Sequence, residues 1–162
     1  MKRFESIKRI IVLWMNFLGL LMQMGVYAYI WFAYYYPLVN GYQAGRQGLK
    51  FYRNGHILVI ALYFVLLFFF TNTFGGLKIG YLKPVDVFLS QLFSVLIVNV
   101  ITYVQISLMR NWVVTPVYLA GAMVVQLVIA VIWVNFCDRV YRRVFPPRKM
   151  LLVHGERYIK KV

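Results

Sequence analysis

Four long apolar runs follow one another along the chain, at residues 10–36, 57–74, 85–109 and 112–136. The first run holds no charged residue, and the third has Asp86 only at its start. A helix that crosses the hydrocarbon core of a bilayer needs about 20 predominantly apolar residues, so each run is long enough to span a membrane. Apolar residues continue without a break instead of alternating, which favours helices over strands. The pattern predicts an all-α bundle of four transmembrane helices.

Local signals refine the ends of these runs. Pro84 and Asp86 suit a helix start, because proline fits the first turn and an acid there complements the helix dipole. At the N-terminus, Lys2 and Arg3 before an apolar stretch resemble a signal peptide, and Val26 and Ala28 offer small residues for cleavage. The apolar stretch is longer than the usual core of about 7–15 residues, so we interpret it as an uncleaved signal anchor.

The composition is typical of a membrane protein and excludes several other protein classes. Hydrophobic residues make up 62% of the 162 residues and charged residues 14%, whereas soluble chains are about 45–50% apolar and about 25% charged. A soluble domain of this length could not bury so much apolar surface, and disordered chains are poor in such residues. The single cysteine, Cys137, excludes a disulfide framework within the chain and a zinc site built from cysteines.

Positive charge is distributed unevenly along the sequence. Eighteen Lys and Arg oppose four Asp and Glu, which gives a net charge of +14. Residues 1–9, 71–84 and 137–162 together hold fourteen of these cations, and cytoplasmic segments carry the excess of Lys and Arg. We therefore expect both termini to be cytoplasmic, with residues 1–9 as a basic tail. The cations flank the apolar runs instead of lining a groove, which favours contact with anionic lipids over nucleic-acid binding.

Tryptophans fall near the predicted ends of the spans. Trp14 and Trp133 lie near the cytoplasmic ends, and Trp31 and Trp112 lie near the outer ends. Tryptophan is enriched at both membrane–water interfaces, so we expect these side chains to anchor the helices there.

The polar residues inside the predicted spans are all neutral. In the first span Asn16 and Gln23 share one helical face with Gly19. In the third span Gln91, Ser94, Thr102 and Gln105 form a polar arc on one side of the helix, with Asn99 at its edge. An ionisable group at mid-membrane would be expected of a proton-coupled carrier, and the spans contain none. The neutral faces favour helix–helix packing through amides and small residues, as does Ala120-Gly121-Ala122 in the fourth span. The functional alternative is a polar groove for a lipid headgroup or a pore lining.

A basic segment follows the fourth run. Its candidate contacts with anionic lipid are Arg139, Arg142, Arg143, Arg148 and Lys149, each worth about 1 kcal/mol near an anionic surface. After the Pro146-Pro147 pair, residues 150–153 form a short apolar run before Gly155. This pattern predicts the first strand of a truncated cytoplasmic α/β domain. Residues 10–136 are thus expected to form the four-helix transmembrane domain, and residues 137–162 the basic juxtamembrane segment and the start of a cytoplasmic domain.

Three segments, taken in order, resemble the bacterial polyprenyl-phosphate sugar-1-phosphate transferases. They are Phe74-Gly75-Gly76-Leu77-Lys78-Ile79-Gly80-Tyr81 with the helix start after it, Asn99-Val100-Ile101-Thr102-Tyr103-Val104-Gln105, and Phe145-Pro146-Pro147-Arg148-Lys149 before Leu151-Leu152-Val153. The resemblance implies a four-helix membrane region, a Rossmann-like domain and a separate catalytic domain. It also implies transfer of a sugar phosphate from a UDP-sugar to undecaprenyl phosphate, with an acidic pair and magnesium, in the bacterial cytoplasmic (inner) membrane.

The sequence therefore predicts the membrane-anchoring region of such a transferase, acting in exopolysaccharide or capsule biosynthesis. No acidic pair occurs in these residues, so we assign no catalytic, cofactor or metal residue here and expect magnesium only in the absent catalytic domain. The expected partners are anionic lipids, a second copy of the chain and polysaccharide-assembly proteins. The alternatives are a small transporter or flippase subunit for lipid-linked sugars and a membrane scaffold for polysaccharide assembly.

Overall fold

The computed structural model describes residues 2–39, 55–110 and 113–144, and their side chains from residue 10 onward except at residue 110. These residues form α1 (Lys2–Ile30), a π-helical turn η1 (Trp31–Tyr35), α2 (Tyr36–Val39), α3 (Gly55–Phe74), α4 (Pro84–Arg110) and α5 (Val117–Val144). The described part of the chain is helical and contains no strand. The strand predicted at residues 150–153 lies outside the described residues.

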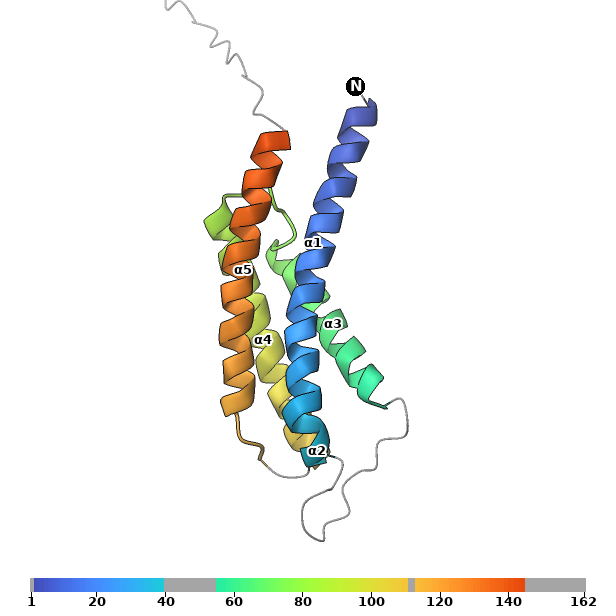
Figure 1. Cartoon of the computed structure of the whole chain (residues 1–162), viewed down its shortest axis with the longest axis vertical. Coiled ribbons are helices and arrows are strands. Elements are labelled where there is room, and N and C mark those ends of the chain that lie inside the picture. The colour runs from blue at the N-terminus through green and yellow to red at the C-terminus, as the bar shows by residue number, and fades with distance from the viewer. Residues whose placement is uncertain (1, 40–54, 111–112, 145–162) are drawn as a thin grey trace, which may run out of the picture.

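Four helical segments are long and apolar enough to cross a membrane, which confirms the predicted all-α class. They are Ile10–Val39, Gly55–Phe74, Pro84–Met109 and Val117–Val144. The helices pack in the order α1, α3, α4 and α5 around the bundle. Figure 1 shows the start of α1, the α3–α4 connection and the end of α5 at one end of the bundle, and α2 at the other.

The fourth helix is shifted along the sequence relative to the predicted run at residues 112–136. It begins only at Val117, because a residue before proline is disfavoured in the helical region and Pro116 follows Thr115 directly. Beyond Phe136 the helix continues for two more turns, where Arg142 Nε binds Asp138 Oδ2 at 2.9 Å across one helical turn. The first helix likewise begins at Lys2, inside the basic tail expected at residues 1–9.

The first span changes its helical pitch near its C-terminal end, just before α2. Proline has no amide hydrogen and its ring clashes with the carbonyl four residues earlier, so Pro37 of α2 cannot make the backbone hydrogen bond that a regular helix has at that position. The chain widens into the π-helical turn η1 just before it, where the Tyr36 amide donates to the Trp31 carbonyl. A π-turn accommodates this proline without breaking the span.

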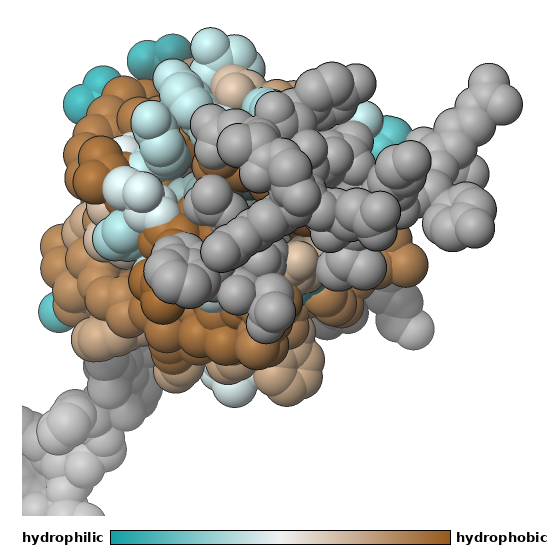
Figure 2. All heavy atoms as spheres, turned by 90° about the horizontal axis from the view of Figure 1, so that it is seen from below, coloured by the Kyte–Doolittle hydropathy of each residue, from teal (hydrophilic) through white to brown (hydrophobic). Residues whose placement is uncertain are grey.

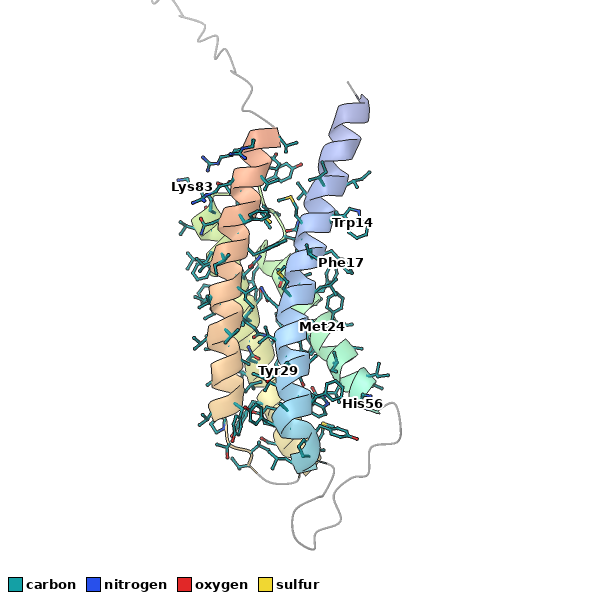
Figure 3. The ribbon with its side chains drawn as sticks, viewed as in Figure 1. Trp14, Phe17, Met24, Tyr29, His56 and Lys83 are labelled. Carbon is teal, nitrogen blue, oxygen red and sulfur yellow. The ribbon has the colours of Figure 1, made fainter. Side chains whose placement is uncertain are left out.

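Aromatic side chains fill much of the centre. Tyr27, Trp31, Tyr35 and Tyr63 are almost completely buried between the helices together with Leu67. Trp31 was expected at an interface, but it lies in the core. Trp14 instead projects outward from α1, as expected of a membrane-facing anchor (Figure 3).

The outer surface of the bundle is apolar. Large aliphatic and aromatic side chains stand exposed on all four spans, including Leu13, Leu58, Leu108 and Ile132. Seen along the bundle, hydrophobic residues occupy much of its circumference (Figure 2). Water-soluble monomers rarely expose contiguous apolar patches larger than a few hundred Å², so this surface fits a lipid solvent.

The short connection between α3 and α4 folds back onto the ends of α1 and α5. Gly75 and Gly80 adopt φ angles of +84° and +80°, a region that residues with a Cβ rarely enter. Ile79 is buried against Val87, Val134 and Cys137. The connection is thus packed as part of the bundle.

Candidate functional site

Gln126 of α5 is completely buried and joins all four long helices. Its Oε1 accepts a hydrogen bond from Asn99 Nδ2 of α4 at 3.0 Å. Its Nε2 donates to the Tyr63 hydroxyl of α3 at 2.7 Å and to the Gln23 backbone carbonyl of α1 at 3.0 Å. Four parts of the sequence therefore meet at one amide, which we call the Gln126 centre.

An aromatic stack extends the Gln126 centre toward α1. The rings of Tyr27 and Tyr63 lie face to face, with centroids 3.9 Å apart and planes inclined by 10°. Because the hydroxyl of Tyr63 accepts from Gln126, the stack fixes the acceptor that positions the amide. The site is a polar contact that joins the four long helices.

Some buried polar atoms at this level have no hydrogen-bond partner among the described residues. They include Gln23 Oε1, Asn99 Oδ1 and the Tyr27 hydroxyl oxygen. Carbonyl and hydroxyl oxygens of this kind can accept hydrogen bonds from a polar molecule. The Gln126 centre thus offers hydrogen-bond acceptors in the middle of an apolar bundle.

The structure distributes the polar residues predicted from the sequence over three places. Gln23 and Asn99 lie in the Gln126 centre. Asn16 and Gln91 bind the α3–α4 connection, where Asn16 Nδ2 donates to the Leu77 carbonyl at 2.6 Å and Gln91 Nε2 to the Gly76 carbonyl at 3.4 Å. The remaining three stay on their own helix.

Those three residues of α4 make no side-chain bond to another helix in the described structure. Ser94 and Thr102 are buried, and each hydroxyl donates to the carbonyl four residues earlier, at 2.7 Å. Gln105 is half-buried. The predicted polar face of the third span is therefore divided between helix contacts and local backbone bonds.

Sequence reasoning missed Gln126 and Tyr63, which complete the Gln126 centre. A signal for Gln126 was present, because it is the only Asn or Gln between residues 113 and 134. A lone amide in a membrane span usually faces another helix. Nothing comparable marked Tyr63, since tyrosine is common in these spans and its partner depends on how the helices are rotated.

A second cluster lies at the end of the bundle that holds the α3–α4 connection. Exposed cations gather there: Lys78, Lys83, Arg139, Arg142 and Arg143, and we call this cluster the basic end. Figure 3 shows Lys83 at this end and His56 at the opposite one. The predicted lipid contacts Arg139, Arg142 and Arg143 are thus joined by two lysines from the loop. Arg148 and Lys149 lie outside the described residues.

The segments that carry the basic end are packed against one another. Trp133 Nε1 of α5 donates to the Met15 carbonyl of α1 at 3.0 Å, and a Cβ placed on Gly80 would lie 2.7 Å from the Tyr141 ring. Loop, α1 and α5 are in close contact here, so the cations are held on a defined surface.

Neither cluster has the composition of a metal centre. Within the described ranges, no three His, Cys, Asp or Glu residues come together as metal ligands. The amides, hydroxyls and cations that are present can donate and accept hydrogen bonds and can attract anions.

Comparison with known proteins identifies no relative of this chain. No protein-family model, no curated protein and no solved structure matches this chain. The class of protein follows from the chain's own architecture, in which four long apolar helices indicate a multi-pass membrane protein.

Proposed function

We propose that this chain is the membrane anchor of a sugar transferase that moves a sugar-1-phosphate from a UDP-sugar to undecaprenyl phosphate. The transferase would act at the bacterial cytoplasmic membrane, in exopolysaccharide or capsule biosynthesis. The ordered motifs that resemble this family support the reaction. The structural observation that supports anchoring is the Gln126 centre, where polar side chains join the helices to one another.

In this proposal the catalytic and magnesium-binding groups belong to a separate domain. The described residues provide a platform with exposed cations at one end. At a membrane leaflet rich in anionic lipid, each such cation contributes about 1 kcal/mol of attraction. The basic end would hold the catalytic domain close to the bilayer surface, where the phosphate of the lipid acceptor lies.

The anchoring proposal is tested on the gene and on the native product. We expect the open reading frame to continue past Val162 and the native protein to be well above 19.1 kDa on a blot. Purified transferase of full length should transfer sugar phosphate to polyprenyl phosphate, and the 162-residue chain alone should not. Transfer by the short chain would contradict the anchor role, and a stop codon directly after Val162 would favour a stand-alone membrane protein.

The orientation is part of the same proposal. We place the basic end and both termini in the cytoplasm, because Lys and Arg are in excess on that side. Cysteines introduced at Lys83, directly before α4, and at Thr115, between the end of α4 and the start of α5, test it because they lie at opposite ends of α4. A membrane-impermeant maleimide added to intact cells should label Thr115→Cys and leave Lys83→Cys unlabelled until the membrane is opened. The reverse labelling pattern would show that the basic end and both termini lie outside the cytoplasm.

A transporter for lipid-linked sugars is the second candidate. The observation that favours it is the set of buried acceptors at the Gln126 centre, Gln23 Oε1, Asn99 Oδ1 and the Tyr27 hydroxyl. The test is movement of a lipid-linked sugar across liposomes that contain only the purified chain. Movement that Asn99→Leu abolishes would support transport. Movement no greater than in empty liposomes would count against transport and favour the anchoring function.

A further inference from the structure

Four polar side chains at the level of the Gln126 centre are almost completely buried. They are Gln23 and Tyr27 of α1, Asn99 of α4 and Gln126 of α5, and their exposed fractions are 4% or less. The interior of a membrane bundle offers no bulk water to such groups, so each polar atom needs a partner inside the protein. The hydrogen bonds of these side chains can therefore be counted atom by atom.

Direct contacts satisfy the amide of Gln126 and leave its neighbours incomplete. Both hydrogens of Gln126 Nε2 are used, towards Tyr63 and the Gln23 carbonyl. Its Oε1 accepts from Asn99. Gln23 Oε1, Asn99 Oδ1 and the Tyr27 hydroxyl oxygen, however, have no hydrogen-bond partner among the described residues. Because buried polar side-chain atoms mostly bind the protein or ordered water, three such atoms around one amide require an explanation.

The three oxygens without a partner belong to one neighbourhood. Gln23 and Tyr27 are four residues apart on α1, so their side chains lie on the same face of the helix. Asn99 binds Gln126, which in turn binds the Gln23 carbonyl. The Tyr27 ring lies face to face with that of Tyr63, whose hydroxyl accepts from Gln126. Each oxygen is thus carried by a direct partner of Gln126 or by the ring stacked on one.

The chemistry of these groups defines the molecule that would fit between them. The two amide oxygens can only accept hydrogen bonds, so the molecule must donate at least two. The Tyr27 hydroxyl can donate, so the molecule should also accept. All three oxygens are enclosed by the bundle, so the molecule must be small. Water meets all of these conditions, because it donates two hydrogen bonds and accepts two.

A cation would fit the same place poorly. An isolated charge in an apolar interior is very costly unless an opposite charge lies beside it. The acidic side chains nearest along α4 and α5 are Asp86 and Asp138, and each is several helical turns away from the Gln126 centre. The neutral amides and hydroxyls of the centre therefore match a neutral molecule.

We propose that the Gln126 centre encloses an ordered water molecule that binds Gln23, Asn99 and Tyr27. The water donates to Gln23 Oε1 and Asn99 Oδ1, and it accepts from the Tyr27 hydroxyl. Buried waters in proteins make about three hydrogen bonds of this kind, to groups that have no other partner. The site lies inside the bundle and is independent of any enzymatic role of the chain.

The water gives α1 a different attachment from that of the other helices. Gln126, Asn99 and Tyr63 join α3, α4 and α5 directly through their side chains. In contrast, α1 reaches Gln126 directly only through the Gln23 backbone carbonyl. Its two polar side chains at this level, Gln23 and Tyr27, bind the centre through water.

Solid-state NMR of the full chain in liposomes detects such a water directly. Polarisation is transferred from water protons to carbon, and its build-up at Gln23 Cδ and Asn99 Cγ is compared with that at the methyl carbons of Leu67. Leu67 is completely buried in the apolar core, so it reports how fast polarisation reaches a dry part of the bundle. We expect the two amide carbons to build up several times faster. Equal rates would overturn the proposal.

Removal of one hydroxyl gives an independent measurement. In a dry site Tyr27→Phe would remove a buried hydroxyl that has no partner, and the bundle would become no less stable. In a hydrated site the same change deprives the water of its donor. We then expect the unfolding equilibrium constant in mixed micelles that contain SDS to rise about fivefold, the usual effect of losing one hydrogen bond. The build-up at Gln23 and Asn99 should slow in the same variant.

Two other tyrosines provide matched controls. Tyr29→Phe, also on α1, removes the hydroxyl of a side chain that is 71% exposed and should leave the equilibrium unchanged. Tyr103→Phe removes a hydroxyl that donates to the Val114 carbonyl at 3.0 Å and shows the effect of losing a direct bond. Tyr27→Phe should resemble Tyr103→Phe. If it unfolds like Tyr29→Phe, or less readily than the natural chain, the proposal is wrong.

Discussion

Replacing Gln126 by leucine is the most direct test of how the bundle is held together. Leucine has a similar size and leaves the apolar contacts of the site in place. It removes three hydrogen bonds, to Asn99, Tyr63 and the Gln23 carbonyl. It also leaves the amide of Asn99 buried without its acceptor.

The expected magnitude follows from these bonds. Hydrogen bonds between helices in a membrane average about 0.6 kcal/mol, so three of them amount to about 2 kcal/mol, or about a thirtyfold change in the unfolding equilibrium. The Asn99 amide also loses its acceptor, and this lowers the free energy of unfolding further, because a buried polar group without a partner costs about 1–3 kcal/mol. We expect Gln126→Leu to lower the free energy of unfolding by about 3–5 kcal/mol.

The assay is unfolding in mixed micelles of increasing SDS content, followed by tryptophan fluorescence. Trp31 lies in the core and Trp133 at the contact of α5 with α1, so their emission reports on the packed bundle. Gln105→Leu is the control, since Gln105 is half-buried and makes no hydrogen bond within the described residues. Tyr63→Phe removes one bond and should cost about 0.6 kcal/mol.

The reasoning would be refuted in two ways. Gln126→Leu could unfold at the same SDS fraction as the natural chain, which would mean that apolar packing alone holds the helices together. Alternatively, Gln105→Leu could lose as much stability as Gln126→Leu. The loss would then come from adding a leucine to a membrane helix, and the contacts of Gln126 would have no special weight.

Three further predictions concern the helix contacts. Gly19→Ala should destabilise the bundle by about 1–3 kcal/mol in the same assay, because its Cβ would lie 2.6 Å from Trp133 Nε1. Gly25→Ala is the control and should be neutral or slightly stabilising, because a Cβ there has no atom within 4 Å. Equal losses of stability in the two variants would contradict this geometry. Gly80→Ala should cost at least about 1 kcal/mol through its positive φ and its contact with the tyrosine ring on α5, whereas an unchanged transition would show that the loop is not fixed on that helix. Cys137 should resist a membrane-permeant maleimide in the folded chain and react fully in SDS, because its side chain is buried; rapid labelling before unfolding would place it elsewhere.

The number and type of the helices could be predicted from the sequence because run length is a local property. An uninterrupted apolar run of the right length has few other stable arrangements in a bilayer. The predicted end of the fourth run was displaced for a local reason too, since Pro116 delays the helix start and the Asp138–Arg142 pair extends its end.

The partners of the polar residues could not be predicted in the same way. Asn99 stood at the edge of the predicted polar arc, and the structure places it in the centre, while Gln105 stood within the arc and is half-buried. A rotation of one helix by a few tens of degrees decides which amide faces inward, and that rotation is set by packing against three other helices. Trp31 illustrates the same limit, because position along a span does not give the direction of the side chain.

The Gln126 centre also sets an order of events during synthesis. The segment that carries Gln126 follows the other three long helices along the chain, so it is synthesised last of the four. Until then the Asn99 amide and the Tyr63 hydroxyl lack the partner they have in the finished bundle. Exposed polar groups of this kind are poorly tolerated by lipid, so the unfinished chain would remain beside the insertion machinery, which offers a more polar environment. Addition of this one glutamine then supplies hydrogen bonds to α1, α3 and α4 at once.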